Sequence, residues 1–167
     1  MRTLALLAAA SSALVLGAWC PEDARTAIAE ALARSLEATR NEDIDAYMAL
    51  VPPDLLLKQD DGSTTTRDQL RADVLQQWSI IDRTLAIEAV IDRMERNPDG
   101  SWTVWTSQRW ERVMIGRDGK SRHNIVTTQK HREVWRCYGD RWFNYEIEEL
   151  GGQLWIDGEL QQRGGQA

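Results

Sequence analysis

Residues 102–135 read WTVWTSQRWERVMIGRDGKSRHNIVTTQKHREVW, and their pattern indicates two long β-strands joined by a turn. Polar and apolar side chains alternate on both sides of Asp118-Gly119, a dipeptide typical of two-residue hairpin turns. A two-residue turn pairs Arg117 with Lys120 and sets the register of two long antiparallel strands. In that register Trp102 lies opposite Trp135 at the far end of the hairpin.

The register sorts the side chains onto two faces, because cross-strand partners share a face. The more apolar face should be covered, and it carries Trp102, Val104, Thr106, Gln108, Trp110, Met114, Ile125, Thr127, Gln129, His131 and Trp135. The opposite face carries Trp105, Arg109, Glu111, Lys130, Arg132 and Arg136. The middle of the covered face is polar. Burying an unpaired polar group costs about 1–3 kcal/mol, so this patch should contact water, its own neighbours or a ligand.

Further strands flank this hairpin, so we expect a four-stranded antiparallel meander from Thr84 onward. Turn signals stand at residues 97–100 and 138–140. The last strand should run from Trp142 to Glu149, and the parity of its turn is open. An odd-length turn places Phe143, Tyr145 and Ile147 inward, whereas an even one places Asn144, Glu146 and Glu148 there. The hydrophobic count favours the odd turn.

Three amphipathic helical segments precede the strands. The first opens at Pro21-Glu22-Asp23 and repeats apolar residues every four positions. Asn41 is the expected cap of a short second helix, which Pro52 stops. A capping box at residues 66–69 starts the third helix. Its apolar side comprises Leu70, Val74, Trp78 and Ile81, and residues 55–57 should form a short strand before it.

The N-terminus predicts export. Residues 4–17 are uncharged and mostly apolar, and this run is shorter than the roughly 20 residues that span a membrane. We therefore expect a cleavable signal peptide at 1–18, a domain at 22–158 and a flexible tail at 159–167. Lipidation of Cys20 would attach the domain to a membrane, but bulky Trp19 stands where a lipid-attachment motif needs a small residue.

Charge and cysteine content narrow the function classes. The net charge is −6, and nucleic-acid binding depends on positive charge, so we do not expect a nucleic-acid partner. Cys20 and Cys137 could pair in an oxidising compartment, or both could stay as thiols. His123 and His131 lie eight residues apart on one strand, roughly 26 Å, which is too far to share a metal ion. We expect neither a metal nor a cofactor.

Several phrases carry a resemblance to a known superfamily: Asn41-Glu42-Asp43-Ile44-Asp45-Ala46-Tyr47, Arg67-Asp68-Gln69-Leu70, and the ending Val134-Trp135, Arg141-Trp142 and Glu148-Glu149-Leu150. In this order the chain, over roughly residues 24–158, resembles nuclear transport factor 2, ketosteroid isomerase and the SnoaL-like polyketide cyclases. The resemblance implies an α+β, cystatin-like cone with N-terminal helices packed on the concave face of a strongly bent antiparallel sheet. It also implies a pocket inside the cone and frequent dimerisation through the outer side. No catalytic signature can be carried over.

The leading functional hypothesis is a pocket for a small, partly apolar molecule of unknown identity. Its expected lining is Tyr47, Trp78, Thr106, Gln108, Trp110, Thr127, Gln129 and Tyr145. The alternative is an isomerase or dehydratase with His131 as general base, oriented by Glu133; a plain core histidine bonded to Thr106 fits the same pattern. A third hypothesis is a homodimer or interaction module formed through the outer face around Trp105.

Overall fold

The computed structural model describes residues 20–58 and 64–161. The expected signal peptide lies outside these residues. Three helices come first: α1 (Ala24–Arg40), α2 (Ile44–Met48) and α3 (Arg67–Trp78). A small hairpin of β1 (Leu56–Lys58) and β2 (Thr64–Thr66) separates α2 from α3. Within the described part of the chain, no helix is long and apolar enough to cross a membrane.

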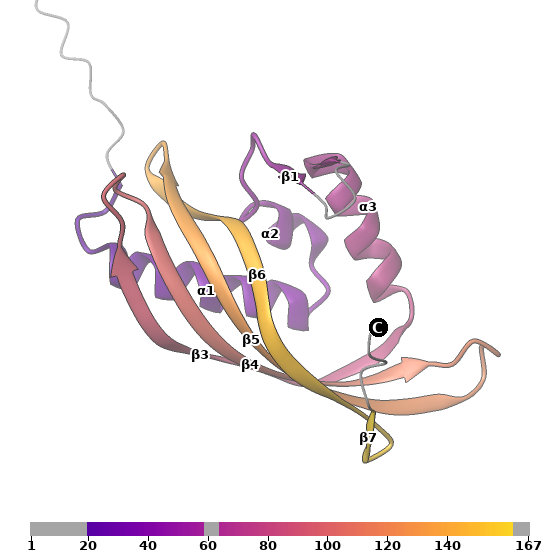
Figure 1. The fold of residues 1–167 in the computed structure, drawn as a ribbon. Helices are drawn as coiled ribbons and strands as arrows, with labels where there is room; N and C mark the ends of the chain where they lie inside the picture. The colour runs from indigo at the N-terminus through magenta and orange to yellow at the C-terminus, as the bar shows by residue number, and fades with distance from the viewer. Residues whose placement is uncertain (1–19, 59–63, 162–167) are drawn as a thin grey trace, which may run out of the picture.

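The second half of the chain forms one antiparallel meander. Its strands are β3 (Ile81–Arg96), β4 (Trp102–Ile115), β5 (Arg122–Tyr138), β6 (Arg141–Ile156) and β7 (Glu159–Gln161), and they lie in sequence order. The helices cover one face of this sheet, as Figure 1 shows. The chain is therefore α+β, with N-terminal helices packed against a five-stranded sheet. Residues 159–161, expected in a flexible tail, form β7 against β6, and residues 162–167 lie outside the described part.

Helix boundaries follow local capping. Asp23 caps α1, and Thr66 caps α3 in a capping box completed by Gln69. The expected cap of α2 is wrong. Asp43 fills that position and its Oδ1 accepts from the Ala46 amide at 2.9 Å. Asn41 instead has helical dihedrals and ends α1, where its backbone amide donates to Glu37.

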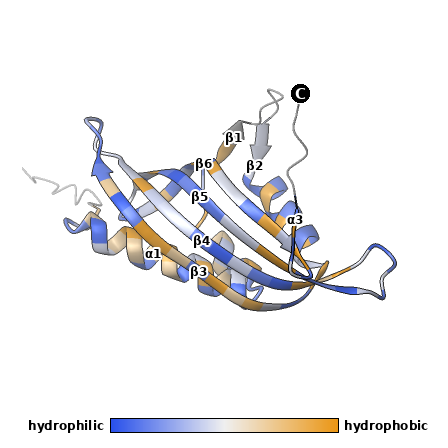
Figure 2. Ribbon diagram, turned by 60° about the horizontal axis from the view of Figure 1, so that its bottom comes forward, coloured by the Kyte–Doolittle hydropathy of each residue, from blue (hydrophilic) through white to orange (hydrophobic). Residues whose placement is uncertain are grey.

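The predicted register of β4 and β5 is confirmed. Trp102 pairs with Trp135, Thr106 with His131 and Gln108 with Gln129. The ladder runs without a shift from Trp102 to Ile115, and alternating hydropathy is visible along the strands in Figure 2. Register shifts occur instead in the flanking β3–β4 and β5–β6 ladders. The sheet is not strongly curled, contrary to the expected strong bend.

The last strand differs from both expected patterns. Tyr138 pairs with Arg141 across a two-residue turn, so Asn144 lies opposite Trp135 on the inner face. A register shift after Asn144 then brings Ile147 opposite Glu133. The predicted odd turn is therefore wrong. Ile147 still lies on the inner face, because the extra residue at the register shift changes which residues point inward. A count of hydrophobic residues cannot show where such a shift occurs.

The main core joins the first helix to the later strands. It comprises Ala24, Ile28 and Ala31 of α1 with Met94, Val104 and Trp135 of the sheet. Cys20 is joined to Cys137 by a disulfide, which ties the start of the described chain to the end of β5. A separate cluster around Trp78 packs α3 against the start of β3.

Candidate functional site

A cavity of about 420 Å³ lies between the helices and the inner sheet face. Its helical wall is mostly apolar and comes from α1, α2 and the segment that follows: Ala31, Leu32, Ser35, Leu36, Thr39, Tyr47, Leu50, Val51, Pro52 and Leu55, with Leu70 of α3. Its sheet wall is polar and aromatic: Gln108, Trp110, Gln129, His131, Glu133, Trp135, Asn144, Tyr145 and Ile147. This volume lies in the range of small-molecule sites.

Five of the eight residues expected to line the pocket do line this cavity, together with His131, the expected general base. The five are Tyr47, Gln108, Trp110, Gln129 and Tyr145. Trp78 is instead buried behind Tyr47, with ring centroids 5.9 Å apart. Thr106 is buried and donates a hydrogen bond to Glu133. Thr127 is half-buried and is not among the lining residues. Some polar residues in the middle of the inner face therefore line the cavity, and others lie behind the lining.

Glu133 is the centre of a hydrogen-bond network in the sheet wall. Its side chain is 1% exposed. Oε1 accepts from Thr106 Oγ1 at 2.9 Å, and Oε2 accepts from Trp135 Nε1 at 2.9 Å and Asn144 Nδ2 at 3.0 Å. Burial raises the pKa of Glu133, and the bonds from Thr106 and Trp135 and the nearby His131 partly oppose that rise.

The network extends along β4. Trp110 Nε1 donates to Gln108 Oε1 at 3.0 Å, and Gln108 Nε2 donates to Thr106 Oγ1 at 3.2 Å. A row of bonds therefore runs from the indole of Trp110 to the carboxylate of Glu133. This row fixes the side-chain amide of Gln108, so the wall presents a defined pattern of polar atoms to the cavity.

The network leaves two buried polar atoms unpaired at the cavity. His131 Nδ1 and Asn144 Oδ1 have no hydrogen-bond partner among the described residues. The expectation that Glu133 orients His131 is therefore not met, because the described bonds of Glu133 come from other donors. Sequence reasoning missed Asn144 because it favoured the odd turn. Alternation alone had placed Glu133 correctly beside His131.

The rim of the cavity is tied across by one hydrogen bond. Tyr145 Oη donates at 2.9 Å to Oδ1 of Asp54, which lies between α2 and β1. The pKa of Tyr145 is raised to about 12, first by burial and then by this carboxylate. The bond holds the segment that contains Pro52 and Leu55 against β6, and so positions part of the apolar wall.

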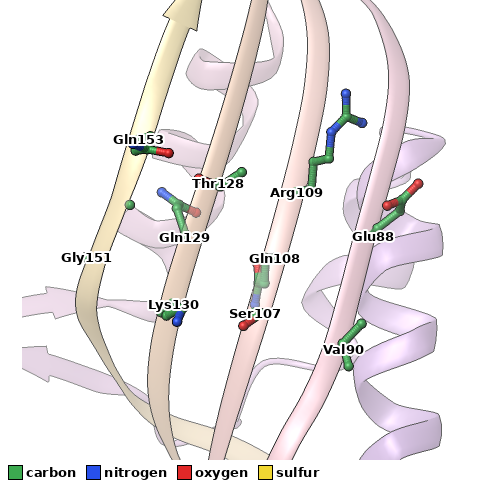
Figure 3. Close-up of a pocket in the computed structure, with 11 residues that line it drawn as sticks. Glu88, Val90, Ser107, Gln108, Arg109, Thr128, Gln129, Lys130, Gly151 and Gln153 are labelled. Carbon is green, nitrogen blue, oxygen red and sulfur yellow. The ribbon is translucent and has the colours of Figure 1, made fainter. Parts of the chain in front are cut away.

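A second hollow lies on the outer face of the sheet, opposite the face that the described helices cover, and Figure 3 shows its lining residues. It has a volume of about 570 Å³ and lies over two cross-strand rows of side chains. One row is Val90, Ser107, Lys130 and Gly151, and the other is Glu88, Arg109, Thr128 and Gln153. Although it is larger, none of its described lining residues holds a buried unpaired side-chain atom. The inner cavity is therefore the stronger candidate for a small ligand.

Metal chemistry receives no support from the side-chain arrangement. Across residues 20–58 and 64–161, no group of three or more His, Cys, Asp or Glu side chains could hold a metal ion. His123 contacts Asp157 at 2.7 Å from its Nδ1, at the far end of β5 from the cavity.

Sequence comparisons give no match, and structural comparisons give many. The sequence matches no known family model and no curated protein. A nuclear transport factor 2-like (NTF2-like) protein from Cytophaga hutchinsonii is 17% identical, with a TM-score of 0.57 over 76% of this chain and 97% of its own. A candidate scytalone dehydratase from Novosphingobium aromaticivorans is 11% identical, with a TM-score of 0.62 over 77% and 85% of the two chains.

A type 2 hexachlorocyclohexane dehydrochlorinase (LinA) is also similar in structure. It is 10% identical, with a TM-score of 0.62 over 84% of this chain and 94% of its own. Proteins with different activities thus share one architecture, and at such identities the similarity shows the fold without the function. The chain has the nuclear transport factor 2-like fold that the sequence resemblance implied.

Proposed function

We propose that this chain is an exported protein that binds a small, partly apolar molecule in the inner cavity. The observation that carries the proposal is the pairing of an apolar helical wall with a sheet wall that holds unpaired His131 Nδ1 and Asn144 Oδ1. Each unpaired buried polar atom is destabilising by about 1–3 kcal/mol, and a ligand with polar groups would offset that loss. Export is supported by the apolar N-terminal run and by the Cys20–Cys137 disulfide.

The test is a thermal-shift screen of partly apolar compounds, followed by crystallography of any hit. The variant Ser35→Phe fills the cavity from α1, and Ala33→Phe places the same ring on the exposed side of that helix. Hits should stabilise the wild type and Ala33→Phe but not Ser35→Phe. A broad screen with no shift, and crystals with no density in the cavity, would contradict the proposal.

Catalysis is the second candidate, and the unpaired Nδ1 of His131 favours it. A neutral imidazole with a free nitrogen at a cavity can act as a general base in an isomerisation or dehydration. His131→Gln should then abolish turnover and leave the melting temperature nearly unchanged. If the variant instead loses stability while the wild type shows no turnover, His131 is a structural residue.

The outer face supports a third proposal, a homodimer. Trp105 is half-buried there, with the guanidinium carbon of Arg93 3.7 Å from its ring centroid. The neighbouring hollow carries both Glu88 and the cations Arg109 and Lys130. Two copies related by a two-fold axis could match these charges, because a self-complementary surface needs both signs.

A further inference from the structure

We propose that the inner cavity selects organic cations, in particular aromatic or alicyclic amines, over neutral or acidic molecules of the same shape. This inference rests on the binding function proposed above and specifies its ligand class. Three features carry it: the charge of the lining, the acceptor atoms at one end of the cavity, and the aromatic side chains of its walls.

The described lining contains one carboxylate and no lysine or arginine. That carboxylate, Glu133, accepts bonds only from the neutral donors Thr106, Trp135 and Asn144 among the described contacts, and it forms no ion pair there. Among the described residues no lysine or arginine pairs with this carboxylate, and the titratable side chain that acts on it is His131. A positive ligand beside this buried carboxylate would be strongly attracted to it, because water screens a buried charge weakly.

Arg67 bonds to the Met48 carbonyl behind the helical wall, and Arg112 lies behind the sheet wall at the end away from Glu133. The guanidinium carbon of Arg112 is 4.4 Å from the ring centroid of Trp110, and its Nε has no described hydrogen bond. Arg112 follows Thr106, the partner of Glu133, by six residues of β4, roughly 20 Å along the strand. One end of the cavity therefore lies beside the carboxylate of Glu133, and the end near Trp110 lies closer to a positive charge. An amine should point its nitrogen toward Glu133.

The polar atoms at the Glu133 end are acceptors. Asn144 donates its Nδ2 to Glu133, which leaves Oδ1 as an unpaired acceptor. His131 Nδ1 is also an acceptor in the tautomer with its proton on Nε2. An ammonium group has three donors and no acceptor, so it matches this set better than a hydroxyl or a carboxylate.

Aromatic rings also line the cavity. Tyr47, Trp110, Trp135 and Tyr145 line the cavity. The faces of such rings attract cations, and the attraction is greatest where water is displaced. The rings also pack against the apolar part of an aromatic amine, so one wall favours both halves of the ligand.

The test compares three probes with one ring system: 1-naphthylmethylamine, 1-naphthalenemethanol and 1-naphthoate. Isothermal titration at neutral pH should show the amine binding at least about tenfold more tightly than the alcohol, with naphthoate weakest. Equal or tighter binding of the alcohol or the acid would overturn the inference and leave the binding function intact. Binding of none of the three would also overturn the inference, and the broad thermal-shift screen described above would then decide the binding function.

Two variants separate charge from shape. Glu133→Gln should bring the amine to the affinity of the alcohol, whereas Glu148→Gln, which removes an outer-face carboxylate paired with Arg132, should keep the preference. If Glu133→Gln does not fold, Asn144→Leu replaces it, and its amine affinity should fall at least about threefold more than its alcohol affinity. An unchanged preference in the folded Glu133 or Asn144 variant would overturn the inference.

Discussion

Glu133 shows how a single residue links stability to the site. Three neutral donors hold its carboxylate, and replacing it would leave those donors without a partner. Its position on the inner face follows from alternation along β5, so the sequence predicts that it lies beside His131. Which donors reach it depends on the turn before β6, because Asn144 faces inward only with an even turn.

The raised pKa of Glu133 predicts a pH effect of definite sign. Its ordinary value, 4.5, applies to the unfolded chain. Between 4.5 and the raised pKa the folded state binds more protons, so the contribution of Glu133 to the free energy of unfolding is greatest below 4.5 and falls as pH rises.

Urea denaturation between about pH 4 and pH 8 measures this effect. The unfolding free energy of the wild type should decline relative to that of Glu133→Gln as pH rises, and Glu148→Gln should decline as the wild type does. If the difference in unfolding free energy between the wild type and Glu133→Gln does not change with pH, Glu133 has no raised pKa. The same holds if the wild type gains stability relative to the variant as pH rises.

At the scale of elements, close contact between β5 and β6 depends on Gly152. A Cβ added there would be driven into the carbonyl oxygen of Thr128. Gly152→Ala should therefore lower the free energy of unfolding by about 1–3 kcal/mol. Gln153→Ala, at the next position of the strand, is the control and should change it little. Chemical denaturation measures both, and an unaffected Gly152→Ala protein would mean that the two strands separate easily.

The capping box of α3 gives a second prediction for an element. Thr66 Oγ1 accepts from the Gln69 amide at 3.3 Å, and Gln69 Oε1 accepts from the Thr66 amide at 2.8 Å. Thr66→Ala should lower the free energy of unfolding by about 1 kcal/mol. Gln77→Ala, on an exposed side of the same helix, should have almost no effect, and equal losses in the two variants would argue against the cap.

The elements also mark the limit of prediction from sequence. The Asp118-Gly119 turn signal sets the register of β4 and β5, and the capping box sets the start of α3, because both patterns are local. The face of β6 depends on a register shift between Val134 and Trp135, for which the residues give no local signal. Tyr47 of the helical wall was expected at the pocket, but the part of that wall that α1 supplies, with Ser35 and Thr39, depends on how α1 lies on the sheet and could not be predicted.

At the scale of the whole molecule, the Cys20–Cys137 disulfide closes a loop with a sequence separation of 117 residues. Opening so long a loop should lower the free energy of unfolding by about 2–5 kcal/mol. Denaturation with and without reductant measures the loss. Cys137→Ser should match the reduced wild type and ignore the reductant, and a wild type equally stable in both conditions would contradict the prediction.

The proposed homodimer also belongs to this scale. Trp105→Glu places a charge in the outer face and should convert a dimer into a monomer, as measured by light scattering. Leu85→Glu, an exposed position on β3 outside the hollow, is the control and should leave the dimer intact. A monomeric wild type would exclude this homodimer.

The packing of α1 against the later strands constrains the order of assembly during synthesis. The ribosome makes the apolar stripe of α1 first, yet that stripe packs against Val104 and Trp135, with Trp142 beside them. Ile28, which is fully buried in the finished protein, has no complete partner surface until most of the polypeptide has emerged. The nascent helix should therefore need shielding by a chaperone, and chains truncated before β6 should aggregate.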